Sequence, residues 1–272
     1  MTVLVGVLCK DGVVIGADSA MTSAAGHMRT VQETGVIKIE THYGEIVSAT
    51  TGAIGLSQRF RQELETMLQG KELHSYKGKT PVRYATDLAQ KTIENFKRTL
   101  SPLQQNPQHG FGFGALLAFV CEGKPHLVEF DALQFHPEVK GLTSADGKQK
   151  TRPYVTMGSG QVMGDPFIAH VNRMLFGDSV PTLSEGRLLV AWTLQHVLAY
   201  NTGGVAGDMQ MAVLEKLEGK WTAHNVDVGE TGQQVKDIEA YIGKYWSSTA
   251  PVLDLQKELG TPVPPKAATG TV

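Results

Sequence analysis

The order of apolar segments along the chain constrains its fold more than any single motif does. Short β-branched segments alternate with longer amphipathic ones, in the order strands, two helices, strands, two helices, strands and a last helix. Two antiparallel sheets with helices packed outside each sheet satisfy this order, because every amphipathic helix then covers a sheet face. We therefore predict an α+β fold, a four-layer α/β/β/α sandwich formed as one domain by residues 1–246. Residues 247–272 are predicted to be an irregular C-terminal extension.

Two hairpins are predicted before the first helix. Thr2–Cys9 and Val13–Ala17 are apolar and flank an Asp-Gly pair, which is a strong hairpin turn signal. Val36–Glu40 and Glu45–Thr50 alternate polar with apolar residues, as half-buried strands do. The chain is therefore expected to open with two strand pairs.

Helix starts are predicted from caps that precede residues with helical apolar spacing. Thr80 is followed by proline at the first helical position, and Thr182 and Glu185 have the spacing of a capping box. The five predicted starts are Ser57, Thr80, Asp165, Thr182 and Gln233.

Composition excludes several classes of function. The net charge of the 272 residues is -2 and no basic block stands out, so nucleic acid and anionic membranes are not expected partners. The first apolar run, Val3–Cys9, is too short for a secretory signal or a membrane span, and we expect a cytoplasmic protein. Cys9 and Cys121 form no CxxC and the histidines no HExxH, so neither a metal nor an organic cofactor is predicted.

The opening residues TVLVGVLCKDGVVIGADS resemble the mature N-terminus of proteasome β-subunits and of the bacterial protease HslV. Lys38 in VIKIE, Gly52 in ATTGAIG, and Gly158-Ser159-Gly160 before a helix continue the family's order of motifs. The similarity spans about residues 2–226, and the loop lengths and longer C-terminal part look most like the betaproteobacterial proteasome homologue. The resemblance implies the fold of an N-terminal nucleophile hydrolase and the activity of a threonine-type endopeptidase.

The resemblance also implies a catalytic set consisting of Thr2, Asp18, Lys38, Gly52 and Ser159. Thr2, exposed when the housekeeping aminopeptidase removes Met1, would attack the peptide bond with its own α-amine as base. A charged Lys38, paired with Asp18, would keep that amine neutral by disfavouring its protonation. The Gly52 N–H would stabilise the oxyanion, and the Ser159 hydroxyl would relay the proton of the amine.

Four of these residues also have a purely structural interpretation. Asp18 and Lys38 are typical of an ordinary ion pair, Gly52 of a turn between a strand and a helix, and Ser159 of a helix cap. By the family's arrangement, Met21, Val36 and Thr50 would line the pocket for the residue before the scissile bond and would favour apolar side chains.

Two segments depart from the pattern of proteasome β-subunits. The interval between Thr2 and Lys38 is longer, and the extra residues are predicted to form a loop over residues 22–34. Where β-subunits carry an Asp and a Ser three residues apart, this chain has a Gly-rich stretch from Asn201 to Asp208 that is more like HslV. No catalytic role is therefore assigned to Asn201, Thr202 or Asp208.

Several hypotheses on partners and function follow from the resemblance. The chain is expected to form a homo-oligomeric double ring, a tetradecamer in preference to a dodecamer, with the sites facing an inner chamber that admits peptides or unfolded polypeptides. An ATP-dependent unfoldase that feeds the ring stays an open question. The alternatives are a catalytically inactive ring-forming scaffold of the same fold, and an amidohydrolase that acts on small amides.

Overall fold

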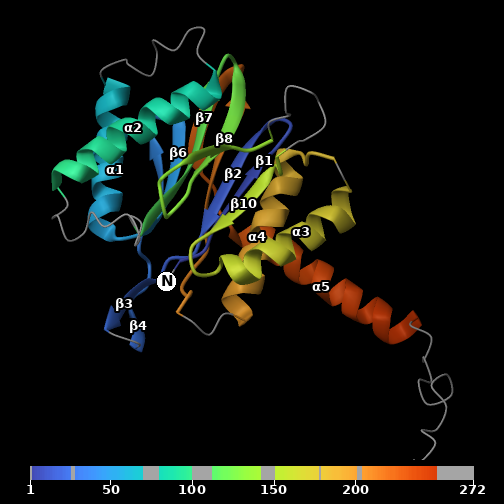
Figure 1. Cartoon of the computed structure of the whole chain (residues 1–272). Helices are drawn as coiled ribbons and strands as arrows, with labels where there is room; N and C mark the ends of the chain where they lie inside the picture. Colours follow the sequence, from blue (N-terminus) through green and yellow to red (C-terminus); the bar gives the residue numbers. More distant parts are fainter. Residues whose placement is uncertain are drawn as a thin grey trace, which may run out of the picture.

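The computed structural model describes residues 2–25, 28–69, 80–99, 112–141, 151–177, 179–200 and 204–249. Two five-stranded antiparallel sheets form the centre of the molecule (Figure 1). The strands of the first sheet, in spatial order, are β10 (Tyr154–Met157), β1 (Leu4–Leu8), β2 (Gly12–Ala17), β11 (Gln210–Leu217) and β12 (Lys220–Asn225). Those of the second are β5 (Ile39–His42), β6 (Ile46–Gly52), β7 (Phe113–Cys121), β8 (Lys124–Phe130) and β9 (Pro137–Val139).

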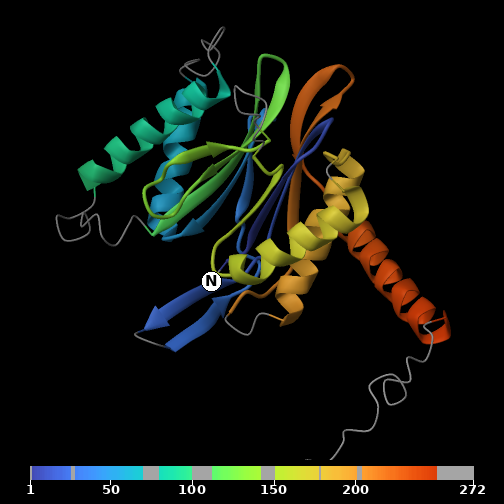
Figure 2. The same cartoon turned by 45° about the vertical axis from the view of Figure 1, so that its right-hand side comes forward.

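Helices cover the outer face of each sheet (Figures 1 and 2). The helices α1 (Ile54–Gln69) and α2 (Pro81–Thr99) pack on the second sheet. The first sheet is covered by α3 (Gln161–Phe176) and α4 (Leu183–Tyr200), while α5 (Gly229–Thr249) packs on α4 and then extends away from the body (Figure 2). The predicted four-layer α/β/β/α sandwich is thereby confirmed.

Strand β1 shows why the opening run of the chain is apolar at every position. Side chains alternate between the two faces of a strand. Leu4 belongs to the core between the two sheets, whereas Val3, Val5 and Val7 belong to the core under α3 and α4. Because both faces are buried, neither favours polar residues, and the strand is paired on both sides, with β10 and with β2.

The predicted starts of α2 and α4, which were based on helix-cap motifs, are confirmed. Pro81 is the first residue of α2. The Thr182 N–H donates to Glu185 Oε2 at 2.7 Å, and the Glu185 N–H lies 3.5 Å from Thr182 Oγ1, as a capping box requires. Hydrogen bonds from the Thr182 backbone and side chain lower the pKa of the Glu185 carboxyl below its ordinary value.

One predicted loop and one predicted helix start before residue 70 are wrong. A third hairpin, β3 (Met21–Ala25) and β4 (Met28–Glu33), stands where residues 22–34 were expected to be loop, and it projects from the body (Figure 2). The helix α1 starts at Ile54 and not at Ser57, since the Ser57 N–H already donates to the Ala53 carbonyl at 3.1 Å within the first turn.

The ends of the later helices also differ from the prediction. Helix α3 starts at Gln161, four residues before the expected Asp165, because the turn after β10 leads directly into it. Helix α5 starts at Gly229 and not at Gln233, and it ends at Thr249, so the expected extension begins inside a helix. Residues 250–272 lie outside the described residues. In the part of the chain that is described, no helix has the length and apolarity to cross a membrane.

Candidate active site

The backbone ladder of the first sheet places Thr2 between two strand ends. Leu4 lies opposite Ala17 of β2 on one side and Met157 of β10 on the other. Two residues before Leu4, Thr2 therefore lies beside the residues that follow these strands, which include Asp18 and Ser159. Thr2 is only 9% exposed. Thr2 is thus held just before the start of β1, a strand that is paired on both sides.

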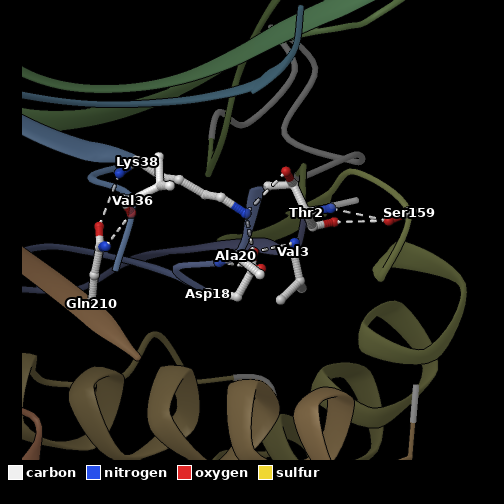
Figure 3. A network of polar contacts seen from close by, with 8 residues as sticks. All are labelled: Thr2, Val3, Asp18, Ala20, Val36, Lys38, Ser159 and Gln210. Carbon is white, nitrogen blue, oxygen red and sulfur yellow. Dashed lines mark hydrogen bonds and ion pairs between the residues drawn. The ribbon is translucent and has the colours of Figure 1, made fainter. Parts of the chain in front are cut away.

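Ser159 and its neighbouring glycines hold the backbone of Thr2. The Thr2 N–H donates to Ser159 Oγ at 3.1 Å, and the Ser159 hydroxyl is 3.3 Å from the Thr2 carbonyl oxygen (Figure 3). The Gly160 N–H donates to the same carbonyl at 3.1 Å. Gly158 has a φ of +84°, and a Cβ there would lie 2.4 Å from the Thr2 carbonyl oxygen. Only glycine permits this close approach.

Lys38 reaches across from the second sheet to Thr2. Its Nζ lies 2.7 Å from Asp18 Oδ1 and 3.2 Å from Thr2 Oγ1 (Figure 3). Asp18 is fully buried, and it also accepts hydrogen bonds from the Val3 N–H at 2.9 Å and the Ala20 N–H at 3.3 Å. Burial lowers the pKa of the Lys38 ammonium below its ordinary value, while Asp18 acts in the opposite direction. The arrangement places one donor, held by a buried carboxylate, directly against the threonine hydroxyl.

Lys38 was expected to lie within a strand but does not, because β5 begins one residue later at Ile39. Its two apolar neighbours also differ from each other, since Ile37 is 70% exposed and Ile39 is only 3% exposed. The prediction that Val36–Glu40 forms a half-buried strand is therefore wrong for residues 36–38, where Ile37 is exposed.

Gly52, the last residue of β6, lies on the wall of the same pocket as Thr2. Its φ is +106°, and a Cβ at this position would lie 2.0 Å from the carbonyl oxygen of Gly112. The strand register, in which Gly52 lies opposite Phe113 of β7, requires this contact. The backbone therefore demands glycine here, whatever part the Gly52 N–H plays in chemistry.

A pocket of about 210 Å³ opens beside Thr2 and Lys38. All three residues predicted to line it, Met21, Val36 and Thr50, lie on its wall. Its lining is more polar than these three residues suggested, because Glu40 and Arg61 form an ion pair there. The pocket thus offers both apolar and charged surface to a ligand.

A buried hydrogen-bonded pair that was not predicted from the sequence also lies at this pocket. Ser48, which lines the pocket, lies 2.7 Å through its Oγ from Nε2 of His42. Both residues are 4% exposed. Burial lowers the pKa of His42, while Glu65, whose Oε1 is 3.8 Å from Nδ1, acts in the opposite direction. The alternation along β6 could have indicated that Ser48 shares a face with Thr50.

The remaining candidates of the sequence analysis are not brought into the site. Asp208 is exposed and precedes β11, and no contact joins it to Thr2 among the described residues. Asn201 and Thr202 lie outside the described residues. Within the described ranges no group of three or more His, Cys, Asp or Glu residues could hold a metal ion.

The four-layer sandwich of two antiparallel sheets is the fold of the N-terminal nucleophile hydrolases. The model of the family described as Proteasome subunit matches residues 2–163, which is more than half of the chain, so this chain belongs to the proteasome subunit family. A search among curated proteins found no match.

Proposed function

We propose that this chain is a threonine endopeptidase of the proteasome kind, in which Thr2 Oγ1 attacks the carbonyl carbon of a peptide bond. The observation that carries the proposal is the position of Lys38 Nζ, which is 3.2 Å from Thr2 Oγ1 and 2.7 Å from the buried Asp18 carboxylate. An ordinary ion pair would not need a threonine hydroxyl as its third member. The family match over residues 2–163 supports the same activity.

The reaction requires Thr2 to carry a free α-amine, so Met1 is first removed by hydrolysis of the bond between them. The reference pKa of an α-amine is about 7.7–8.0, and a nearby ammonium disfavours its protonation. Lys38, kept charged by Asp18, supplies this ammonium. Ser159 holds the amine through the contact that it makes with the Thr2 nitrogen.

The neutral amine then accepts the proton of Oγ1 as Oγ1 bonds to the peptide carbon. The carbonyl oxygen becomes an oxyanion, which the Gly52 N–H stabilises. Collapse of this intermediate breaks the C–N bond, and the ammonium of Thr2 gives its proton to the leaving amine. Water, deprotonated by the same α-amine, finally hydrolyses the ester on Thr2 and restores the enzyme.

Family membership also supports proposals about assembly, since members of this family form rings with copies of themselves. We propose a double ring, a tetradecamer in preference to a dodecamer, that acts on peptides and unfolded polypeptides in the cytoplasm. The likeness to the betaproteobacterial homologue and the feeding of the ring by an ATP-dependent unfoldase remain hypotheses. Sedimentation of a monomer at working concentration would contradict the ring.

The deciding experiment treats the purified protein with an electrophile directed at threonine nucleophiles and maps the adduct by mass spectrometry. The adduct is expected on Thr2 of chains that lack Met1, and Thr2→Ala should neither be labelled nor cleave peptides. Thr222→Ala, on β12 and outside the pocket, is the control and should behave as the parent protein.

The outcomes separate the alternatives. Peptide cleavage by Thr2→Ala at the parent rate contradicts the proposed nucleophile. Rings without any adduct indicate an inactive scaffold, and labelled protein that hydrolyses small amides but no peptides indicates an amidohydrolase.

A further inference from the structure

The backbone that carries Lys38 is irregular, although the Lys38 side chain needs a fixed position. Residues 36–38 lie between β4 and β5 and belong to neither strand. The Val36 N–H donates to the Ser19 carbonyl at 2.9 Å, and the Lys38 carbonyl accepts from the Thr50 N–H at 3.3 Å. The side chain between them, Ile37, is 70% exposed and does not fix the segment by burial.

The side chain of Gln210 supplies two further backbone contacts of this segment. Its Nε2 donates to the Val36 carbonyl at 2.5 Å, and its Oε1 accepts from the Lys38 N–H at 2.9 Å (Figure 3). One amide side chain thus pairs with two residues of an extended segment in the way that a neighbouring strand would, since it offers both a donor and an acceptor. Among the four contacts described for the backbone of residues 36–38, these two depend on a side chain and can be removed by substitution.

Gln210 is itself anchored next to Asp18. It is the first residue of β11 and lies opposite Ala17, the last residue of β2. The backbone of Gln210 therefore fixes it to the strand that carries the carboxylate, while its side chain holds the backbone of the lysine. The Lys38 end of the ion pair is thus held by a residue of β11, and β11 is paired with β2, the strand that Asp18 follows.

We propose that Gln210 is a positioning residue that sets the place of Lys38 against Thr2, and it acts only through Lys38. The inference rests on the proposed peptidase function and deepens it. A lysine side chain has four rotatable bonds, so its ammonium keeps a defined place only if the backbone below it is fixed. Misplacement of a catalytic group by about 1 Å costs on the order of 100-fold in rate.

Two substitutions and a matched control test this role. Gln210→Leu removes both hydrogen bonds, and Gln210→Glu keeps the acceptor for the Lys38 N–H but has no donor for the Val36 carbonyl. Gln195→Leu is the control, because Gln195 lines the same cavity of about 580 Å³ as Gln210. Its Nε2 donates to the Gly232 carbonyl at 3.2 Å and not to residues 36–38.

The first readout needs no activity and is the hydrogen exchange of the Lys38 amide. Gln210→Leu is expected to speed this exchange about tenfold or more, because the amide loses the acceptor that protects it. Gln210→Glu and Gln195→Leu should leave the Lys38 amide protected. Parent-like exchange in Gln210→Leu would contradict the hydrogen bond on which the proposal depends.

The second readout is the pH profile of peptide cleavage. Gln210→Leu should lower kcat about tenfold or more while KM changes less than twofold, since the residue touches no substrate. The acid limb of kcat/KM should move to higher pH, because an ammonium displaced from Thr2 leaves the α-amine easier to protonate. A residue that only stabilised the fold would lower the melting temperature without moving this limb.

The outcomes are separable from those of the proposed function. If the parent protein cleaves through Thr2 and both Gln210 variants keep its kcat and pH profile, the positioning role is refuted. If the parent is inactive, the proposed function fails, and the exchange of the Lys38 amide alone still decides whether Gln210 holds the segment. Should Gln210→Leu not fold, Gln210→Glu carries the kinetic test, with a smaller fall in kcat expected and an unchanged kcat counting against the role.

Discussion

Replacing Lys38 with methionine tests the electrostatic argument for the site without any assay of activity. Methionine keeps an unbranched side chain of similar length but removes the ammonium. Asp18 is fully buried, and the Lys38 side chain is 9% exposed, so the carboxylate would lose its ion-pair partner in a place that water does not reach. The substitution therefore leaves a buried charge without its compensating charge.

The loss of unfolding free energy depends on the hydrogen bonds that the Asp18 carboxylate retains in the variant. Breaking a buried pair by removing one partner costs about 3–5 kcal/mol of unfolding free energy. The Val3 and Ala20 N–H groups still donate to the carboxylate, which reduces the loss. Burial also lowers the pKa of Lys38, so its removal relieves part of an existing cost. We expect a net loss of about 2–3 kcal/mol, equivalent to about 5–10 °C in melting temperature for a chain of this size.

Urea and thermal unfolding at one fixed protein concentration measure this loss, because assembly makes the melting temperature depend on concentration. The double variant Asp18→Asn with Lys38→Met should recover much of the stability, since no buried charge is left. Lys140→Met is the control: Lys140 Nζ pairs with Glu129 at 2.6 Å and Glu138 at 2.9 Å, but these carboxylates are 17% and 55% exposed and, unlike Asp18, keep contact with solvent. A Lys38→Met protein as stable as the parent, or a double variant no better than the single one, would refute the reasoning.

The other predictions concern the backbone, a histidine and a thiol. Gly52→Ala should destabilise the protein by about 2 kcal/mol or more in urea unfolding, because its Cβ would lie 2.0 Å from a carbonyl oxygen. Gly44→Ala is the control and should cost about 1 kcal/mol, because Gly44 has a φ of +67° but no atom within 4 Å of the added Cβ. Equal losses in the two variants would contradict the steric argument. Burial lowers the pKa of His42, so its contribution to stability is complete above the unfolded value of 6.5 and is lost as the pH falls through the lower folded value. The urea midpoint of His42→Gln should therefore depend less on pH between 7.5 and 5.0 than that of the parent, and parallel profiles would count against this. Burial also raises the pKa of the Cys9 thiol, so alkylation at pH 8 should reach Cys9 only in denaturant; rapid labelling of the native protein would show the thiol to be exposed.

Local signals predicted those elements that carry a specific turn or cap motif. The Asp-Gly turn of the first hairpin, Pro81 at the start of α2 and the capping box at Thr182 are each complete within a few residues. The hairpin of β3 and β4 was missed because its residues are mostly small or polar, and neither strand shows the apolar alternation that identifies a buried face. The two strands pair mainly with each other, so no buried face imposes a periodic pattern on their residues.

The candidate site likewise contains residues that the sequence predicted and one that it did not. The five proposed catalytic residues were recognised through their order along the chain, and the structure places Thr2, Asp18, Lys38 and Ser159 in one hydrogen-bonded group. Gln210 was not found, because its partners lie 172 and 174 residues away in sequence. A glutamine at the start of a strand has no sequence signal for such a contact.

The site also depends on the spacing of the two sheets. Thr2 and Asp18 follow the geometry of the first sheet, whereas Lys38 immediately precedes β5 and Gly52 ends β6, both strands of the second sheet. The distance between these two groups is set by the side chains packed between the sheets, among them Leu4, which is fully buried. Protein interiors are packed closely enough that a change of one methylene group shifts their neighbours. The position of the ammonium against the hydroxyl is therefore a property of the whole sandwich, with Gln210 as the local contact that transmits it.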